Sequence, residues 1–281
     1  GIVPVITGFQ GMNENGDITT LGRGGSDTTG VALAVALNAD ECQIYTDVDG
    51  IFTTDPRVCS KARLLKEISF EEMLELSSSG AKVLQLRSVE YASKFNLPIR
   101  VLSSFNEGDG TLVQEEKNIM ERPIVSGISS IDTEAKLTIR GVPDVPGIAA
   151  KILSPISEAG IEVDVIVQNI SADNCTDFTF TVDKGDAENA KEILQKTSVS
   201  LGGGLVEVDH DIAKISVVGR GMRAHAGVAS KMFQALAKDE INISMITTSE
   251  IKISVVIKES EMKKAVTALH NAFDLDKELD S

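Results

Sequence analysis

The sequence predicts an α/β domain with a mainly parallel sheet, followed by two smaller α+β modules. Two observations lead to this prediction: residues 1–118 alternate between strand-like and helix-like runs, and the residues after them contain an internal repeat. The length of 281 residues suits two or three domains at about 100–150 residues each.

The N-terminal part is expected to contain strands at 2–7, 41–46 and 99–102 and helices at 29–37, 70–77 and 82–95. Residues 31–37 are apolar on every side, and the polar run Ser26-Asp27-Thr28 ahead of them favours a buried helix with an N-cap. A turn-rich stretch at 106–110 and a charged stretch at 115–122 then indicate a domain linker.

The strongest organisational signal is a repeat with an offset of 80 residues, in which residues 141–152 match residues 221–232. The coinciding positions are Gly141 with Gly221, Gly147 with Gly227, Ala149 with Ala229, Lys151 with Lys231 and Ile161 with Ile241. Each copy reads as a strand, a helix, two strands and a second helix. This order gives an antiparallel sheet with both helices on one face, the ferredoxin-like arrangement.

The two copies differ in their last strand. A further strand at 205–208 completes the first copy, whereas the second copy ends in the acidic run 274–281. The spare strand 124–130 could fill the vacancy, so we expect the second module to take it up and the two modules to interlock. The expected units are residues 1–118, a linker and donated strand at 119–132, and modules at 133–210 and 211–281.

The overall composition excludes several functions. A net charge of −15 argues against binding to nucleic acid or to anionic membranes. Three cysteines without metal-ligand spacing indicate a reducing compartment, the cytoplasm. There is no signal-peptide pattern and no apolar run of about 20 residues. The chain opens without Met on a strand-like run, so we expect a fragment of a longer protein.

The first chemical motif is the glycine-rich run at residues 22–29. Its glycines let backbone amides approach an anion, and the start of the following helix adds a positive dipole end. Arg23 offers a planar fork for a carboxylate or a phosphate. A plain glycine turn with Ser26 and Asp27 as helix caps explains the same letters. The motif is neither a Walker loop nor a Rossmann fingerprint.

The second motif, residues 45–57, follows a predicted strand, where open α/β sheets bind their ligands. Tyr45 and Phe52 could flank a flat base, and Arg57 could meet phosphates. Taken alone, this segment is more simply interpreted as an acidic loop.

Together, the two motifs resemble the amino-acid kinase superfamily and, within it, the aspartate kinases, which show GRGGSDTT followed by YxDVDGxxTxDPR. Residues 70–73 and 78–84 are also similar to that family, and the repeats look like its tandem ACT domains. The resemblance covers essentially the whole chain. It implies transfer of the γ-phosphoryl group of ATP, with Mg²⁺, to the β-carboxylate of L-aspartate, the first step toward lysine, threonine and methionine.

The resemblance also implies roles for individual residues. Aspartate would be bound by Arg23, Gly24, Gly25 and Ser26, and Asp27 would be the catalytic carboxylate that organises the reacting groups. The ATP site would be lined by Thr46, Asp47, Phe52, Thr53, Thr54, Asp55, Pro56, Arg57 and Lys82. Phosphoryl transfer needs positioning and charge neutralisation more than covalent help, which suits such a set. No metal site of the protein itself is expected.

The sequence departs from the family at its start. The N-terminal part of the kinase domain is missing, including the opening Lys-Phe-Gly-Gly strand, whose lysine helps to neutralise the phosphates. We therefore expect this chain alone to be inactive or nearly so.

ACT domains usually pair and bind amino acids at their interface, so the resemblance implies a homo-oligomer inhibited by lysine, threonine or both. Loop amides near Gly147 and Gly227 suit a carboxylate, and Asp164 suits an ammonium group. The implied effector residues are Glu162, Val163, Asp164, Gln168, Val228, Ala229, Asn242, Ile243 and Ser249. The hydrophobic members also fit core packing, and Asp164 and Asn242 also fit a turn or a cap.

Two other functions stay open on the sequence. The chain could be an amino-acid-binding regulatory or dimerisation subunit without kinase activity, with residues 1–118 as a kinase remnant. A kinase acting on another acid, such as glutamate, is less favoured because of the tandem repeats and the near-complete GRGGSDTT match.

Overall fold

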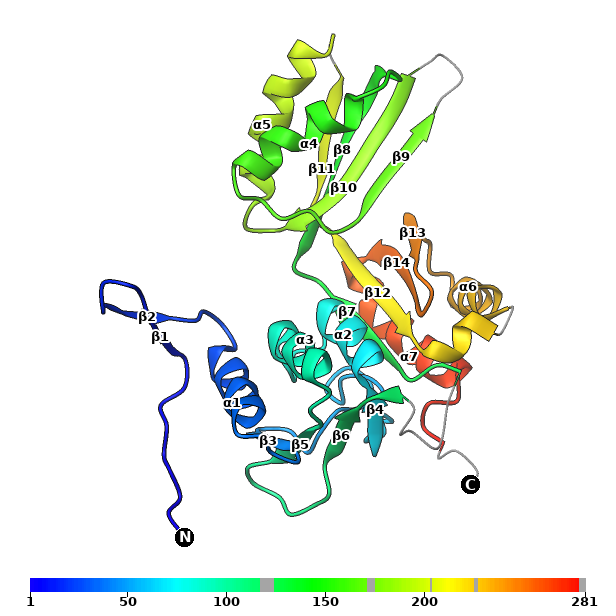
Figure 1. The fold of residues 1–281 in the computed structure, drawn as a ribbon. Helices are drawn as coiled ribbons and strands as arrows, with labels where there is room; N and C mark the ends of the chain where they lie inside the picture. The colour runs from blue at the N-terminus through cyan, green and yellow to red at the C-terminus, as the bar shows by residue number, and fades with distance from the viewer. Residues whose placement is uncertain (117–123, 171–174, 203, 225–226, 278–281) are drawn as a thin grey trace.

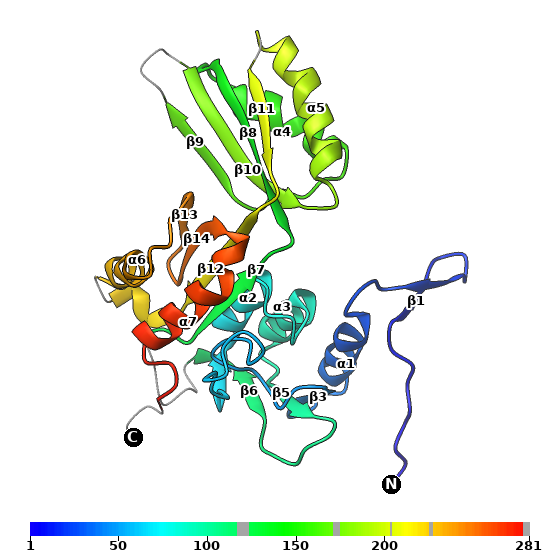
Figure 2. The same cartoon turned by 180° about the vertical axis from the view of Figure 1, so that it is seen from behind.

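The computed structural model describes residues 1–116, 124–170, 175–202, 204–224 and 227–277. They form an α/β domain and two α+β modules (Figure 1). The second module lies against the α/β domain, and the first module stands beyond it (Figure 2). The predicted boundary between residues 118 and 119 falls outside the described residues. None of the described helices has the length and apolar character required for a membrane span.

The α/β domain is built on a four-stranded sheet with the order β3-β5-β6-β4. Two of its strand pairs are parallel and the β5–β6 pair is antiparallel, so the sheet is mainly parallel as predicted. Its helices cover one face (Figures 1 and 2). The bounds are α1 Gly25–Ala36, β3 Cys42–Thr46, β4 Glu67–Ser69, α2 Phe70–Ser78, α3 Leu86–Phe95, β5 Ile99–Ser103 and β6 Thr111–Gln114.

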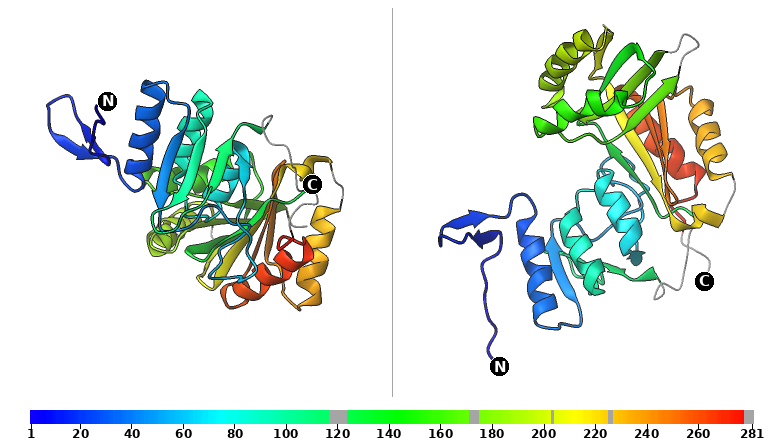
Figure 3. Two further views of the ribbon diagram at one scale, coloured as in Figure 1. Left: turned by 90° about the horizontal axis from the view of Figure 1, so that it is seen from below. Right: turned by 45° about the horizontal axis from the view of Figure 1, so that its top comes forward.

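The strand expected at residues 2–7 does not form. Ile2 and Val5 are 96% and 95% exposed, and the described part of the chain supplies no strand beside them. A strand needs a neighbour to pair its backbone groups, so apolar character alone does not make one. This arm continues into a small hairpin, β1 Gln10–Met12 with β2 Ile18–Thr20, which extends away from the domain in both views of Figure 3.

Two helices begin at other residues than expected. Helix α1 starts earlier, at Gly25, because Gly24 takes the N-cap position in the left-handed conformation (φ 73°) without a side-chain cap. Asp27 therefore lies in the first turn of the helix and is not its cap. Helix α3 starts later, at Leu86, because Gln85 is extended. Lys82 consequently lies in the loop before the helix.

The first module has the sheet order β11-β8-β10-β9, with every pair antiparallel. Its two helices lie on one face of the sheet (Figure 1), and the core between them contains Leu137, Ile152, Phe178 and Leu194. The bounds are β8 Glu134–Pro143, α4 Ile148–Glu158, β9 Ile166–Ile170, β10 Cys175–Asp183, α5 Ala187–Ser200 and β11 Leu205–Asp209.

The second module has the equivalent order β13-β14-β12-β7. Strand β7 pairs with β12 and places Ile128 opposite Val217, so the spare strand lies where the first module has β11. The domain boundaries given from the sequence remain predictions. The bounds are β7 Gly127–Ile131, β12 Ile212–Val218, η2 Arg220–Ala224, α6 Val228–Lys238, β13 Met245–Thr248, β14 Lys252–Lys258, η3 Glu259–Glu261 and α7 Met262–Ala272.

The second strand of each repeat is short. The runs 163–170 and 243–248 form regular ladders only from Ile166 and Met245 onward. The backbone amides of Asp164 and Ser244 still bond to the neighbouring strand, but each does so ahead of the regular pairing.

A buried carboxylate joins the α/β domain to the second module. Glu72 on α2 is 7% exposed and forms a capping box with Ser69 at the start of that helix. Its Oε1 atom accepts hydrogen bonds from the hydroxyl of Ser126, at 2.6 Å, and from the backbone amide of Arg220, at 3.2 Å. Around it, Arg220 pairs with Glu71 and Glu116. These contacts fix α2 against the second module.

Each of the two parts also contributes a residue to the core of the other. Val218 at the end of β12 packs in the core of the α/β domain, whereas Cys59 of the α/β domain, 4% exposed, packs in the core of the second module. The two parts therefore share one continuous packed boundary.

Candidate functional site

The glycine-rich motif forms the loop that leads into α1. A Cβ atom on Gly24 would lie 1.7 Å from Cγ of Gln85, so only glycine permits this close approach of the loop to the segment before α3. Gly25 is buried, whereas Arg23 and Ser26 are exposed. The motif thus presents an arginine and a hydroxyl at the start of a helix, where negative charge is stabilised.

Asp27 is half-buried in the first turn of α1. Burial raises the pKa of its carboxyl group, and a hydrogen bond from the backbone of Gln85 partly offsets this rise. Its charge also raises the pKa of the nearby Cys42 thiol, although burial of that thiol is the larger cause. A half-buried carboxylate beside an arginine loop is a group typical of functional sites.

The second motif begins where β3 ends, at Thr46, whose hydroxyl donates to Asp47 at 3.1 Å. Farther along, Asp55 and Arg57 pair at 2.8 Å. Hydrogen bonding to Arg57 holds the pKa of Asp55 below its usual range, and Lys82 adds to this effect. In turn, the hydrogen bond to Asp55 raises the pKa of Arg57, and the charge of Asp47 adds to this rise. The structure therefore brings Asp47, Asp55, Arg57 and Lys82 into one electrostatic neighbourhood.

The loop at residues 80–85 links the two motifs. Its Lys82 acts on Asp55 of the second motif, and its Gln85 contacts Gly24 and Asp27 of the first. The sequence had placed Lys82 within a helix, but its position in a loop is what brings it to the acidic residues.

Two residues predicted for the ATP site do not offer their side chains to a ligand. Thr53 is 0% and Thr54 is 6% exposed, and the Thr53 hydroxyl lies 2.9 Å from Nε2 of His270 on α7. Phe52 is half-buried and bridges to Leu64, whereas Pro56 and Arg57 are exposed. The usable groups of this segment are therefore at 55–57.

The predicted effector residues fall into two groups. Val163 and Ile243 pack against the cores of their modules and Val228 is part of one, as the packing interpretation expects. The polar side chains are exposed, and the backbone amide of Ser249 closes the turn between β13 and β14. Gly147 and Gly227 are left-handed N-caps at the starts of α4 and α6, with φ values of 88° and 106°.

Asp164 is paired with a residue that sequence reasoning missed. Lys214 on β12 of the second module is 4% exposed, and its ammonium group contacts Asp164 and, at 2.6 Å, Glu134 of the first module. Burial raises the pKa of Glu134, while Lys214 acts in the opposite direction. The signal in the sequence was a lysine inside the apolar run Ile-Ala-Lys-Ile-Ser-Val-Val, all of which is buried.

An apolar cluster adjoins this ion cluster, because Val165 follows Asp164 in the chain and Val256 pairs with Lys214. Val165 of the first module packs with Ile212, Met245 and Val256 of the second. The modules are therefore joined through a small apolar contact with a buried charge at its edge.

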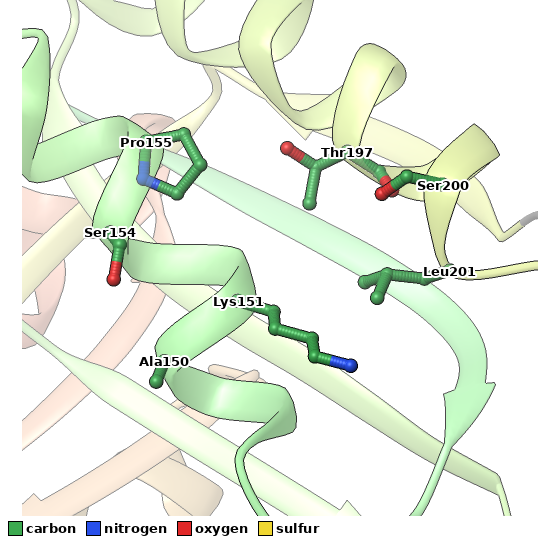
Figure 4. A pocket seen from close by; sticks show the side chains of 7 residues that line it. All are labelled: Ala150, Lys151, Ser154, Pro155, Thr197, Ser200 and Leu201. Atoms are coloured by element: carbon green, nitrogen blue, oxygen red, sulfur yellow. The ribbon is translucent and has the colours of Figure 1, made fainter.

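A separate pocket lies between α4 and α5 of the first module (Figure 4). It has a volume of about 420 Å³, and Lys151 reaches into it from α4 toward the end of α5. None of the predicted effector residues is among those that line it. Within the described ranges, no cluster of three or more His, Cys, Asp or Glu side chains could hold a metal ion.

Comparison with known proteins agrees with this architecture. Residues 1–103 match the amino acid kinase family, and residues 137–198 and 215–273 each match the ACT domain. The aspartokinase of Pseudomonas aeruginosa is 64% identical over 278 residues, which cover 98% of this chain and 68% of that protein. The chain belongs to the aspartokinase family.

Other relatives in the family agree with this assignment. The aspartokinase of Corynebacterium glutamicum is 48% identical over 280 residues, 98% of this chain and 66% of that protein. Among solved structures, the aspartate kinase of Clostridium acetobutylicum has a TM-score of 0.82 at 28% identity over 95% of this chain and 62% of its own. Escherichia coli aspartokinase III has a TM-score of 0.79 at 30% identity, over 94% and 59%.

These findings confirm the predicted family and the predicted fold class, an amino-acid kinase segment followed by two ACT domains. The chain spans about two thirds of the length of its curated aspartokinase relatives. We refer below to the modules as the first and second ACT domains.

The buried ion cluster generates a stability prediction. Replacing Lys214 by Met should lower the free energy of unfolding by about 3 kcal/mol, because Glu134 is left buried without its cation. Urea denaturation of the purified chain measures this change. The double variant Lys214→Met/Glu134→Leu should recover most of the loss, since no buried charge then remains. A single variant within about 0.5 kcal/mol of the parent would contradict the assigned role.

Proposed function

We propose that this chain forms the acceptor loop, part of the ATP site and the regulatory region of an aspartate kinase. A carboxylate oxygen of L-aspartate attacks the γ-phosphorus of ATP, the bond from that phosphorus to the β–γ bridging oxygen breaks, and aspartyl phosphate and ADP are formed. The observation that supports this function best is the half-buried Asp27, which the 80–85 loop connects to Asp55, Arg57 and Lys82.

The charges explain how two anions could meet on an acidic protein. The chain carries a net charge of −15, so aspartate and triphosphate need local cations. Arg23 beside Gly24, Gly25 and Ser26 supplies one for the aspartate carboxylate, and Arg57 with Lys82 supplies the other for phosphates. Mg²⁺ usually binds through phosphates with one or two carboxylates, so it would come with ATP and neutralise its charge. The carboxylates near Arg57 suit that arrangement.

Two solved structures of one relative support the choice of ligands. Escherichia coli aspartokinase III has been solved in complex with aspartate and ADP, and also with lysine and aspartate. The latter has a TM-score of 0.74 to this chain. We therefore propose L-aspartate and ATP as substrates and lysine, threonine or both as effectors.

A purely regulatory role is the second candidate. The regulatory subunit of aspartate kinase from Thermus thermophilus matches 53% of this chain over 99% of its own length, with a TM-score of 0.51 and 40% identity. A regulatory subunit of aspartate kinase therefore exists in that organism. The two candidates differ in whether residues 1–118 take part in turnover.

Turnover should depend on Asp27. We would fuse the part of the Pseudomonas aeruginosa aspartokinase that this chain does not match ahead of Gly1, and assay the chain and the chimera for aspartyl phosphate. We expect turnover by the chimera, little or none by the chain alone, and a fall in kcat of about 100-fold or more in the Asp27→Asn chimera. Asp40→Asn, at an exposed acid outside the site, is the matched control and should keep the parent kcat. A chimera with no activity would favour the regulatory subunit.

Effector binding should depend on Asp164. Calorimetric titration with L-lysine and L-threonine, separately and together, should show saturable binding to the chain. Asp164→Ala should raise the dissociation constant about tenfold or more, because one charge-assisted hydrogen bond is worth about 1.5–3 kcal/mol. In the chimera the same change should weaken feedback and leave the uninhibited rate near normal. A large fall in that rate with feedback intact would reverse the assignment.

The ACT domains also offer a surface for self-association. Ile166 on edge strand β9 and Ile246 on edge strand β13 occupy equivalent repeat positions and are 49% and 48% exposed. Exposed edge strands favour pairing with another chain. Light scattering should give a molecular mass in solution at least twice that of one chain. The Ile166→Lys/Ile246→Lys variant should shift it toward the monomer, whereas Val199→Lys, at an exposed site on α5, should not. A monomer at every concentration would contradict this surface.

A further inference from the structure

The segment that carries the proposed ATP-binding residues is a hairpin, residues 51–65, here called the nucleotide hairpin. Its two arms are joined by backbone hydrogen bonds from Leu65 to Ile51 and from Thr53 to Arg63, both 2.8 Å long. At its turn, the amides of Val58 and Cys59 bond back to the carbonyl oxygen of Asp55. The hairpin therefore presents Asp55 and Arg57 at a fixed position relative to its arms.

The tip of this hairpin is embedded in the second ACT domain. Cys59 belongs to the core of that domain, and Val58 packs against it. Close by, the ammonium group of Lys61 donates to the side-chain carbonyl of Asn271 on α7 at 3.3 Å. The hairpin thus leaves the kinase sheet and finds its packing partners in the regulatory part of the chain.

The arm that leads to Asp55 is held by the same domain. The carbonyl oxygen of Thr53 accepts a hydrogen bond from the backbone amide of Ile128, on β7 of the second domain's sheet, at 2.7 Å. The Thr53 hydroxyl accepts from the amide of Arg63 at 3.0 Å and lies 2.9 Å from Nε2 of His270. His270 is 0% exposed on α7. Burial lowers its pKa, which favours the neutral ring that can serve as a hydrogen-bond partner here.

We propose that His270 is a positioning residue for ATP: through Thr53 it fixes the nucleotide hairpin, so that the second ACT domain is a structural part of the nucleotide site. This inference rests on the proposed kinase function and extends it to a residue 217 positions from its partner in sequence. A group that binds phosphate works only when its support holds it in place, and a displacement of about 1 Å costs much of its effect.

The position of His270 also defines a route for regulation. Helix α7 packs on β7 and β12 of the second ACT domain, so a shift of this helix on effector binding moves Thr53 and with it Asp55 and Arg57. The glycine-rich motif of the aspartate site contacts the 80–85 loop instead. The route therefore reaches the proposed ATP site more directly than the proposed aspartate site.

Kinetics of the chimera test this assignment. His270→Phe, which keeps a ring of similar shape and removes both nitrogens, should raise the KM for ATP about fivefold, the equivalent of about 1 kcal/mol for one lost hydrogen bond. The KM for aspartate should stay within about twofold of the parent, within the scatter of surface substitutions. His270→Gln, which restores a hydrogen-bonding group, should return the KM for ATP toward the parent value. His210→Phe, at an exposed histidine outside the hairpin, is the matched control.

Several outcomes would overturn the proposal. One is an unchanged KM for ATP in a folded His270→Phe chimera, and another is an equal rise of both KM values without rescue by His270→Gln. Should His270→Phe fail to fold, Thr53→Val removes the bond to His270 from the other side, together with the bond from the Arg63 amide. This variant must also raise the KM for ATP and leave the KM for aspartate near the parent value.

A readout without turnover separates this proposal from the kinase function. Hydrogen exchange of the amides at 53–55 and 57–59 should be faster in the His270→Phe chain than in the parent chain, while exchange in the first ACT domain stays unchanged. Faster exchange at the hairpin in a chimera without activity would support the positioning role of His270 and contradict the kinase proposal. Unchanged exchange at the hairpin would contradict the positioning role of His270, whether or not the chimera is active.

Discussion

The carboxylate of Glu72 is the contact on which the relation between the two halves of the molecule depends. One side chain closes the capping box of α2 and accepts hydrogen bonds from Ser126, just before β7, and from Arg220, just after β12. A buried carboxylate is costly unless it is satisfied by donors. Those donors flank two strands of another domain, so the start of α2 and the ends of these two strands are fixed by the same group.

Around this junction, the proposed active site is assembled from segments with different supports. The glycine-rich loop and Asp27 rest on the kinase helices through Gln85, whereas the nucleotide hairpin rests on the second ACT domain through Cys59 and Thr53. The acceptor and the donor of the phosphoryl group would thus be held mainly by different elements of the fold. Such a division makes the geometry between two substrates adjustable, which a regulated enzyme requires.

Local patterns predicted much of this molecule. The repeat offset of 80 residues is reflected in equivalent sheet orders, and the count of strands per copy placed β7 beside β12. Prediction failed where long-range partners decide. The apolar arm at 2–7 has no described neighbour, Thr53 is turned toward His270 far along the chain, and Asp164 meets Lys214 of the other module. No local pattern encodes these partners, although a lysine within a fully buried strand was a sign of one.

The placement of β7 has a consequence for synthesis on the ribosome. This strand emerges before the first ACT domain, whereas its partner β12 emerges only after that domain is complete. During that interval its unpaired edge is available to other nascent chains, and unpaired edges are where aggregation begins. The polar sequence Gly-Ile-Ser-Ser-Ile of β7, poor in the long apolar runs that drive aggregation, suits a strand that must wait for its partner.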